Sequence, residues 1–132
     1  MTTVADFTSI FSGATVTIGD GSNPNGWTES FNTAGRLGAK KAYLTLMLQH
    51  MTATLQNAVV KVNNSKVGEL FNSKDGNALH WQTQMIVFDG GILNDGNNTI
   101  DVFPVDSANP SPGETRDDFN IREVVCHFHK EV

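Results

Sequence analysis

The stretch Val60-Lys61-Val62-Asn63-Asn64-Ser65-Lys66-Val67-Gly68-Glu69-Leu70 is typical of two short β-strands joined by a tight turn. Apolar and polar residues alternate before the turn, as expected of a half-buried strand. Asn tolerates the left-handed backbone conformation that hairpin turns require, so the two adjacent asparagines mark the turn. Gly68 interrupts the returning strand and indicates a bulge. The stretch therefore predicts an antiparallel hairpin.

Strand-like segments of the same kind recur along the chain, separated by clusters of Gly, Asn, Asp and Ser, while helical periodicity is scarce. In the last segment the apolar parity changes between Ile121 and Val124, which predicts a bulge near Glu123. The pattern predicts one antiparallel all-β domain over residues 1–132, a sandwich or a barrel, and we expect the jelly-roll form of the β-sandwich. The expected strands are 14–18, 27–31, 42–49, 58–62, 66–71, 81–88, 99–103 and 118–129.

The composition narrows the classes of partner and compartment. The chain has 132 residues, a net charge of −5, and no basic run longer than Lys40-Lys41, which argues against nucleic acid and anionic membrane surfaces as partners. The N-terminus lacks the pattern of a signal peptide, and no apolar stretch is long enough to span a bilayer. We expect a soluble protein, cytoplasmic or exported by a leaderless route, with its compartment unassigned.

Two tryptophans are candidate contacts for a ligand. Trp27 follows a loop rich in Gly and Asn, and Trp81 follows His80 at the start of a strand. Sugar rings have apolar faces that stack on indole, while polar neighbours bind the hydroxyl groups. We therefore select Trp27, Trp81 and His80, together with Arg116 and Asp117 before the last strand. The alternative is that both tryptophans fill or cap the core, as tryptophans usually do.

Acidic residues flank the long Pro-containing loop between the last two strands. Asp106 lies at its start, and Asp117 and Asp118 lie at its end. Calcium binds through carboxylate and carbonyl oxygens, so these three residues are candidate calcium ligands. The alternative is a strand-start cap beside a solvated loop.

The segment Cys126-His127-Phe128-His129 offers a second candidate metal site. On a strand His127 and His129 point to one face, and two imidazoles at this spacing can share a metal when a third ligand is present. This pair underlies the hypothesis of a small metal-dependent enzyme; the alternative is a solvated polar face. Cys126 has the opposite parity, which predicts a buried, inert thiol.

Three stretches in the second half resemble the galactose-binding-like jelly-roll domains. Residues 60–70 resemble their Val-Asn-Gly hairpin, residues 91–102 resemble their Leu-x-x-Gly-x-Asn-x-Ile-x-Val turn and strand, and residues 117–125 resemble their closing Asp-Asp-Phe strand. The resemblance implies a β-sandwich whose binding sites lie in loops at one end. Many such domains bind carbohydrate, others bind proteins or lipids, and the resemblance transfers no catalytic residue.

These observations leave three hypotheses. The first is a non-catalytic, lectin-like module that binds carbohydrate through loops near Trp27, Trp81 and residues 106–118. The second is a structural or assembly protein that binds another chain, which a contiguous exposed apolar patch would favour. The third is the metal-dependent enzyme. Because multivalency gives weak sugar binders useful avidity, we also expect a homo-oligomer.

Overall fold

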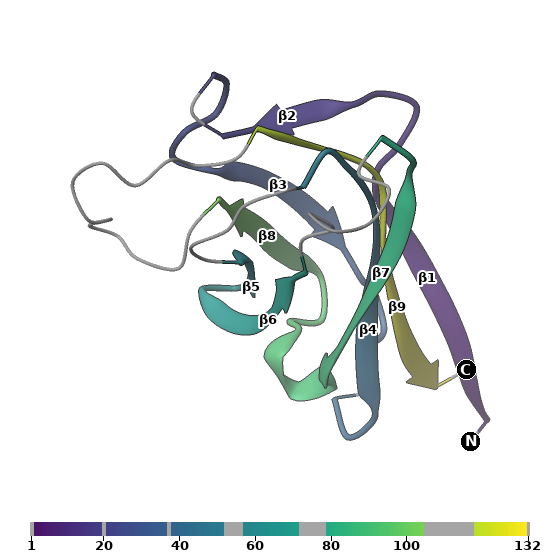
Figure 1. Ribbon diagram of the computed structural model, residues 1–132. Helices are drawn as coiled ribbons and strands as arrows, with labels where there is room; N and C mark the ends of the chain where they lie inside the picture. The colour runs from purple at the N-terminus through teal and green to yellow at the C-terminus, as the bar shows by residue number, and fades with distance from the viewer. Residues whose placement is uncertain are drawn as a thin grey trace.

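Two antiparallel sheets pack around one core in the computed structural model (Figure 1). It describes residues 2–19, 21–36, 38–51, 57–71, 79–104 and 118–131. The first sheet has the order β1 (Thr3–Phe11), β9 (Phe119–Glu131), β4 (Lys41–Gln49) and β7 (Gln82–Asp89), and β2 (Val16–Ile18) also pairs with β9. The second sheet has the order β3 (Trp27–Asn32), β8 (Asn97–Phe103), β5 (Ala58–Val62) and β6 (Ser65–Leu70). The chain passes repeatedly between the sheets, which is the jelly-roll arrangement predicted from the sequence.

The inward faces of the sheets form the core, and β4 shows why these sequences form strands. Ala42, Leu44, Leu46 and Leu48 are buried, whereas the residues between them remain partly exposed. Successive side chains of a strand point to opposite faces, so this period-two pattern buries one face and solvates the other. The second sheet contributes its own apolar face, which includes Val60, Val62, Ile100 and Val102.

The predicted hairpin is confirmed. Asn63 and Asn64 form its turn with positive φ angles of 50° and 67°. The register shifts between Val60, which pairs with Gly68, and Lys61, which pairs with Lys66. The returning strand therefore carries the predicted bulge, because one extra residue lies on that side of the ladder.

The predicted bulge in β9 is also confirmed. Glu123 has a φ of 51°, and the β4–β9 register shifts there: Thr45 pairs with Val125 and Met47 pairs with Arg122. The bulge reverses the parity of the strand, because the residue at the bulge adds one position to β9 but none to its partner. Buried side chains therefore lie on the same face before and after it.

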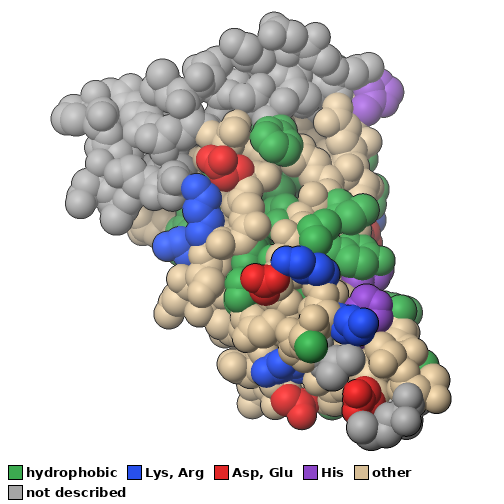
Figure 2. Space-filling model, turned by 90° about the horizontal axis from the view of Figure 1, so that it is seen from below, with side chains coloured by type: hydrophobic (Ala, Val, Ile, Leu, Met, Phe, Trp, Pro, Cys, Tyr) green, Lys and Arg blue, Asp and Glu red, His purple; other side chains and the backbone are tan. Residues whose placement is uncertain are grey.

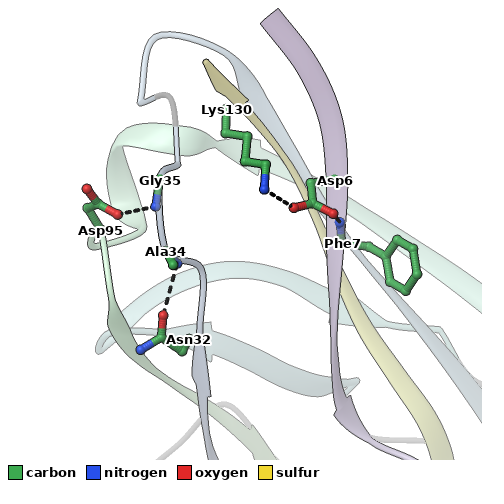
Figure 3. A network of polar contacts seen from close by, with 7 residues as sticks. All are labelled: Asp6, Phe7, Asn32, Ala34, Gly35, Asp95 and Lys130. Atoms are coloured by element: carbon green, nitrogen blue, oxygen red, sulfur yellow. Dashed lines mark hydrogen bonds and ion pairs between the residues drawn. The ribbon is translucent and has the colours of Figure 1, made fainter. Parts of the chain in front are cut away.

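Strand β1 was not predicted from the sequence. Its inward-facing parity includes Asp6 and Thr8, so the apolar alternation that identifies a strand is weak. The strand instead forms through pairing with β9, with Thr3 opposite Glu131. Lys130 Nζ lies 2.8 Å from Asp6 Oδ2 across this pair (Figure 3). The hydrogen bond from Lys130, and then that from the backbone N–H of Phe7, lowers the pKa of Asp6.

The topology gives the sandwich two different ends. At the loop end, β3, β7 and β9 begin and β4 and β8 finish. At the turn end lie the β5–β6 turn, the short 3-10 helix η1 (Gly90–Ile92) and the turn before β8. The N- and C-termini lie beside each other, away from the start of β3 (Figure 1). Within the described ranges, no helix has the length and apolar character needed to cross a membrane.

Candidate ligand-binding site at the loop end

The structure brings four of the predicted site residues to the loop end. Trp27 begins β3, His80 and Trp81 directly precede β7, and Asp118 directly precedes β9. His80 and Asp118 are exposed, and the two tryptophans are partly buried. The other predicted residues, Asp106, Arg116 and Asp117, lie outside the described residues.

Trp81 is held by Arg122, a residue that no sequence pattern predicts to lie near it. The guanidinium of Arg122 lies 5.4 Å from the centroid of the Trp81 ring, a cation–π contact. Arg122 belongs to β9 and pairs with Met47 of β4, the strand between β9 and β7. No spacing in the sequence relates positions 81 and 122, because their proximity depends on the order of the strands.

A chain of hydrogen bonds supports the segment before Trp81. Thr17 Oγ1 donates to Asn120 Oδ1 (2.7 Å), and Asn120 Nδ2 donates to Gln49 Oε1 (3.2 Å). Gln49 Nε2 in turn donates to the carbonyl oxygen of Leu79 (2.8 Å). These hydrogen bonds cross the first sheet from β2 through β9 and β4 to the residues before β7. They therefore fix the backbone that presents His80 and Trp81.

Trp27 is packed at the edge of the core. Its ring meets Phe11 edge-to-face, with a centroid distance of 5.4 Å and an interplanar angle of 70°. It shares its strand face with buried Phe31 and packs against the core cluster. Gly26 before it has a φ of 99°, and a Cβ there would lie 2.8 Å from the carbonyl oxygen of Val102. Trp27 therefore caps the core, which is the alternative to a ligand contact. Contact of Trp27 with a ligand stays a prediction.

Asp118 joins the β2–β3 loop to the start of β9. Its Oδ1 accepts a hydrogen bond from the backbone N–H of Gly21 (2.8 Å). A Cβ at Gly21 would lie 2.9 Å from Asp118 Oδ2, so glycine allows this close approach. Among the described residues, no three His, Cys, Asp or Glu side chains form a group able to hold a metal ion. The calcium site stays a prediction, because two of its three ligands fall outside the described ranges.

His127 and His129, the candidate metal ligands, lie away from the loop end on the outer face of the first sheet. The His127 ring stacks on Tyr43 at a centroid distance of 4.3 Å and an angle of 8°. The Nδ1 of His129 lies 3.3 Å from the carbonyl oxygen of Lys41. Neither histidine has a third metal-ligating side chain in the part of the chain that the structure describes. Cys126 is buried, and burial raises the pKa of its thiol to about 12, which matches the predicted inert thiol.

No protein-family model and no curated protein sequence matches the chain. Its fold does match solved structures. A family 35 carbohydrate-binding module from Clostridium thermocellum has a TM-score of 0.57 at 13% identity, over 93% of this chain and 98% of that chain. The CBM36-1 domain of a multidomain xylanase from the hindgut metagenome of Trinervitermes trinervoides has a TM-score of 0.51 at 15% identity, over 98% and 100%. This chain has the jelly-roll β-sandwich fold that these structures share.

The same jelly roll is found within a longer protein. BpGH86A, a β-porphyranase of glycoside hydrolase family 86 from the human gut bacterium Bacteroides plebeius, has a TM-score of 0.55 at 13% identity. The match covers 97% of this chain and 21% of that one. At such identities the likeness concerns the fold, so it confirms the jelly-roll β-sandwich expected from the sequence and transfers no site residue.

Proposed function

We propose that this protein is a non-catalytic carbohydrate-binding module whose ligand contacts Trp81 at the loop end. The observation that carries the proposal is the fixed, partly exposed Trp81 indole beside exposed His80. The fold supports it, because structures that share the fold include carbohydrate-binding modules of families 35 and 36.

The local geometry suits a sugar ring. An indole stacks on the apolar face of a pyranose, and neighbouring polar groups bind its hydroxyls. Arg122 and the hydrogen bond from Gln49 to Leu79 hold this segment before a ligand arrives. Such preorganisation strengthens binding because less conformational entropy is lost on association. Asp118, at the same end, would contribute one carboxylate to the predicted calcium site.

A glycan array tests the proposal. Wild-type protein, Trp81→Ala and Trp27→Phe are screened with calcium and with EDTA, after circular dichroism has verified folding. Trp27→Phe is the matched control, because phenylalanine preserves the edge-to-face packing against Phe11. We expect at least one glycan that the wild type binds to lose its signal in Trp81→Ala and to keep it in Trp27→Phe. A blank array for the wild type in both conditions would reject the module, and undiminished binding by Trp81→Ala would reject this site.

A different observation favours the assembly hypothesis as the second candidate. Phe7, Met85 and Val87 are 63%, 61% and 59% exposed on the outer face of the first sheet. Phe7 pairs with His127, His127 with Tyr43 and Tyr43 with Val87, so these side chains form a row across four strands. Figure 2 shows hydrophobic side chains and histidines adjoining on one flank, while acidic and basic side chains are interspersed.

Light scattering tests the assembly hypothesis and the expected homo-oligomer. If the row is a self-association surface, a mass above 14.3 kDa will fall to the monomer value in Val87→Lys. Thr83→Lys, on the same strand and also exposed, is the control for added charge. A monomeric wild type would reject self-association through this face.

A further inference from the structure

An open depression of about 500 Å³ lies in the second sheet toward the turn end. It is lined by Ser30, Asn63, Asn94, Asn97, Asn98 and Thr99. Every one of these side chains carries a hydroxyl or a carboxamide, and none of them is charged or aromatic. The depression is therefore chemically distinct from the loop end, where Trp81, Arg122 and Asp118 lie.

The amide of Asn98 gives this depression a rigid base. Asn98 is only 4% exposed although it lines the depression. Its Nδ2 donates to the carbonyl oxygens of Asn94 (3.0 Å) and Gly96 (2.8 Å). Its Oδ1 accepts from the backbone N–H of Asn94 (2.7 Å) and from Asn63 Nδ2 (2.8 Å). A buried amide with these partners holds one orientation, because reorienting it would leave buried polar groups unpaired.

Asn63 is fixed in the same way. Its Oδ1 accepts the backbone N–H of Thr99 (3.0 Å), and its Nδ2 also donates to the carbonyl oxygen of Ile92 (2.9 Å). The donors and acceptors of these two side-chain amides are therefore occupied by hydrogen bonds within the protein. They shape the depression and leave the rim to contact a ligand.

The rim presents exposed donors and acceptors. Ser30 and Thr99 are direct partners on β3 and β8, and both are exposed. Asn97 is exposed, and its Oδ1 accepts from Asn32 Nδ2 (3.2 Å), which leaves its own Nδ2 to donate. Within the described residues, the hydroxyls of Ser30 and Thr99 make no side-chain hydrogen bond. Two hydroxyls and an amide N–H therefore face the depression together on a rigid base.

We propose that this depression is a second binding site that takes a neutral saccharide. Because none of the lining side chains is charged, a phosphate, a carboxylate or a metal ion would find no opposite charge to pair with. A lining without aromatic or aliphatic side chains offers little to a lipid or an apolar peptide. Hydroxyl and amide groups both donate and accept hydrogen bonds, which matches the hydroxyls of an uncharged sugar. The volume lies within the range of about 300–1,000 Å³ usual for small-ligand sites.

The position of the depression has a functional consequence. It lies toward the turn end, whereas Trp81 lies at the loop end, so one chain could hold two glycan chains at once. Two sites on one module raise avidity for a multivalent surface and allow glycan chains to be bridged. The second site does not depend on the loop-end site, and each can be tested with the other disabled.

Two-dimensional NMR of ¹⁵N-labelled protein tests the site. The probes are cellohexaose, xylohexaose and neoagarohexaose, with trigalacturonate as the charged comparison. We expect at least one neutral probe to shift the resonances of Ser30, Asn97 and Thr99 in a saturable way, and trigalacturonate to leave them unchanged. These shifts should persist in Trp81→Ala. In Asn97→Ala/Thr99→Val, the dissociation constant for the shifts at Ser30 should rise at least fivefold.

Thr83→Val is the matched control, because Thr83 is an exposed strand threonine on the other sheet. It should bind as the wild type does. Shifts confined to the surroundings of Trp81 would overturn the second site and leave the proposed loop-end function standing. Shifts confined to Ser30, Asn97 and Thr99 would support the second site and overturn the proposed loop-end function. If no probe shifts resonances at either end, both proposals are overturned.

Discussion

Asn63 Nδ2 lies 2.8 Å from Asn98 Oδ1, so the turn of the β5–β6 hairpin is hydrogen-bonded to the start of β8. The two residues belong to different stretches of the sequence, and each of these stretches resembles the galactose-binding-like domains. Their side chains bond mainly to backbone groups in nearby turns. Asn63 and Asn98 therefore stabilise the fold, and they also give the depression on the second sheet its rigid base.

Replacing Asn98 should be costly. Asn98→Ala removes the acceptor for Asn94 N–H and Asn63 Nδ2 and the donor for Gly96, leaving several groups unpaired. We expect the free energy of unfolding to fall by about 2–3 kcal/mol in urea denaturation. Asn97→Ala, at the exposed neighbouring position, should cost less than about 0.5 kcal/mol. Equal effects of the two substitutions would contradict the role given to Asn98.

Asn64 is a site for stabilisation. It has a φ of 67° in the hairpin turn, a conformation that glycine adopts without a steric penalty and alanine does not. We expect Asn64→Gly to stabilise the protein by a few tenths of a kcal/mol and Asn64→Ala to destabilise it by about 1 kcal/mol, as measured by thermal unfolding. An alanine variant more stable than the glycine variant would show that the turn has another geometry.

Cys126 should make stability fall at alkaline pH. Burial raises the pKa of its thiol from 9.0 to about 12, so between these values the unfolded state loses the proton that the folded state retains. The protonated Cys126 thiol therefore contributes fully to the free energy of unfolding below pH 9. This contribution is lost as the pH rises toward 12, with a limiting slope of about 1.4 kcal/mol per pH unit. Urea denaturation from pH 7 to 11 measures it, with Cys126→Ala as the reference that lacks this titration. Parallel pH profiles for the two proteins would contradict the prediction.

Arg122 should hold the ring of Trp81. Arg122→Met keeps an unbranched side chain but removes the cation over the indole. In a Trp27→Phe background, where Trp81 is the sole tryptophan, we expect weaker near-ultraviolet circular dichroism and a loss of stability of about 0.5–1 kcal/mol. Lys61→Met removes a comparable cation over Phe103 and serves as the control, because it should leave the Trp81 signal unchanged. An unchanged signal in Arg122→Met would show that other contacts orient the ring.

Patterns among neighbouring residues in the sequence predicted much of the fold. Alternation in β4, the turn at Asn63 and Asn64, and the parity change around Glu123 each depend on neighbours in the chain, so they could be predicted from the sequence. Strand β1 could not, because Asp6 and Thr8 occupy its inward parity and its order comes from pairing with β9. Of the loop-end site, the positions of His80 and Trp81 beside a strand start were predictable. The contact with Arg122 was not.

The all-β architecture with its main strands and turns could be predicted from the amino-acid sequence, because period-two alternation and turn-forming residues act over a few positions. The sequence also determined that Cys126 would be buried, since parity along one strand decides the face of a side chain. Three features depend on the three-dimensional fold: the contact of Arg122 with Trp81, the packing of Trp27 on Phe11, and the uncharged side chains around Ser30 and Thr99. These contacts join strands far apart in the chain, and the order in which strands pair is a property of the whole sheet.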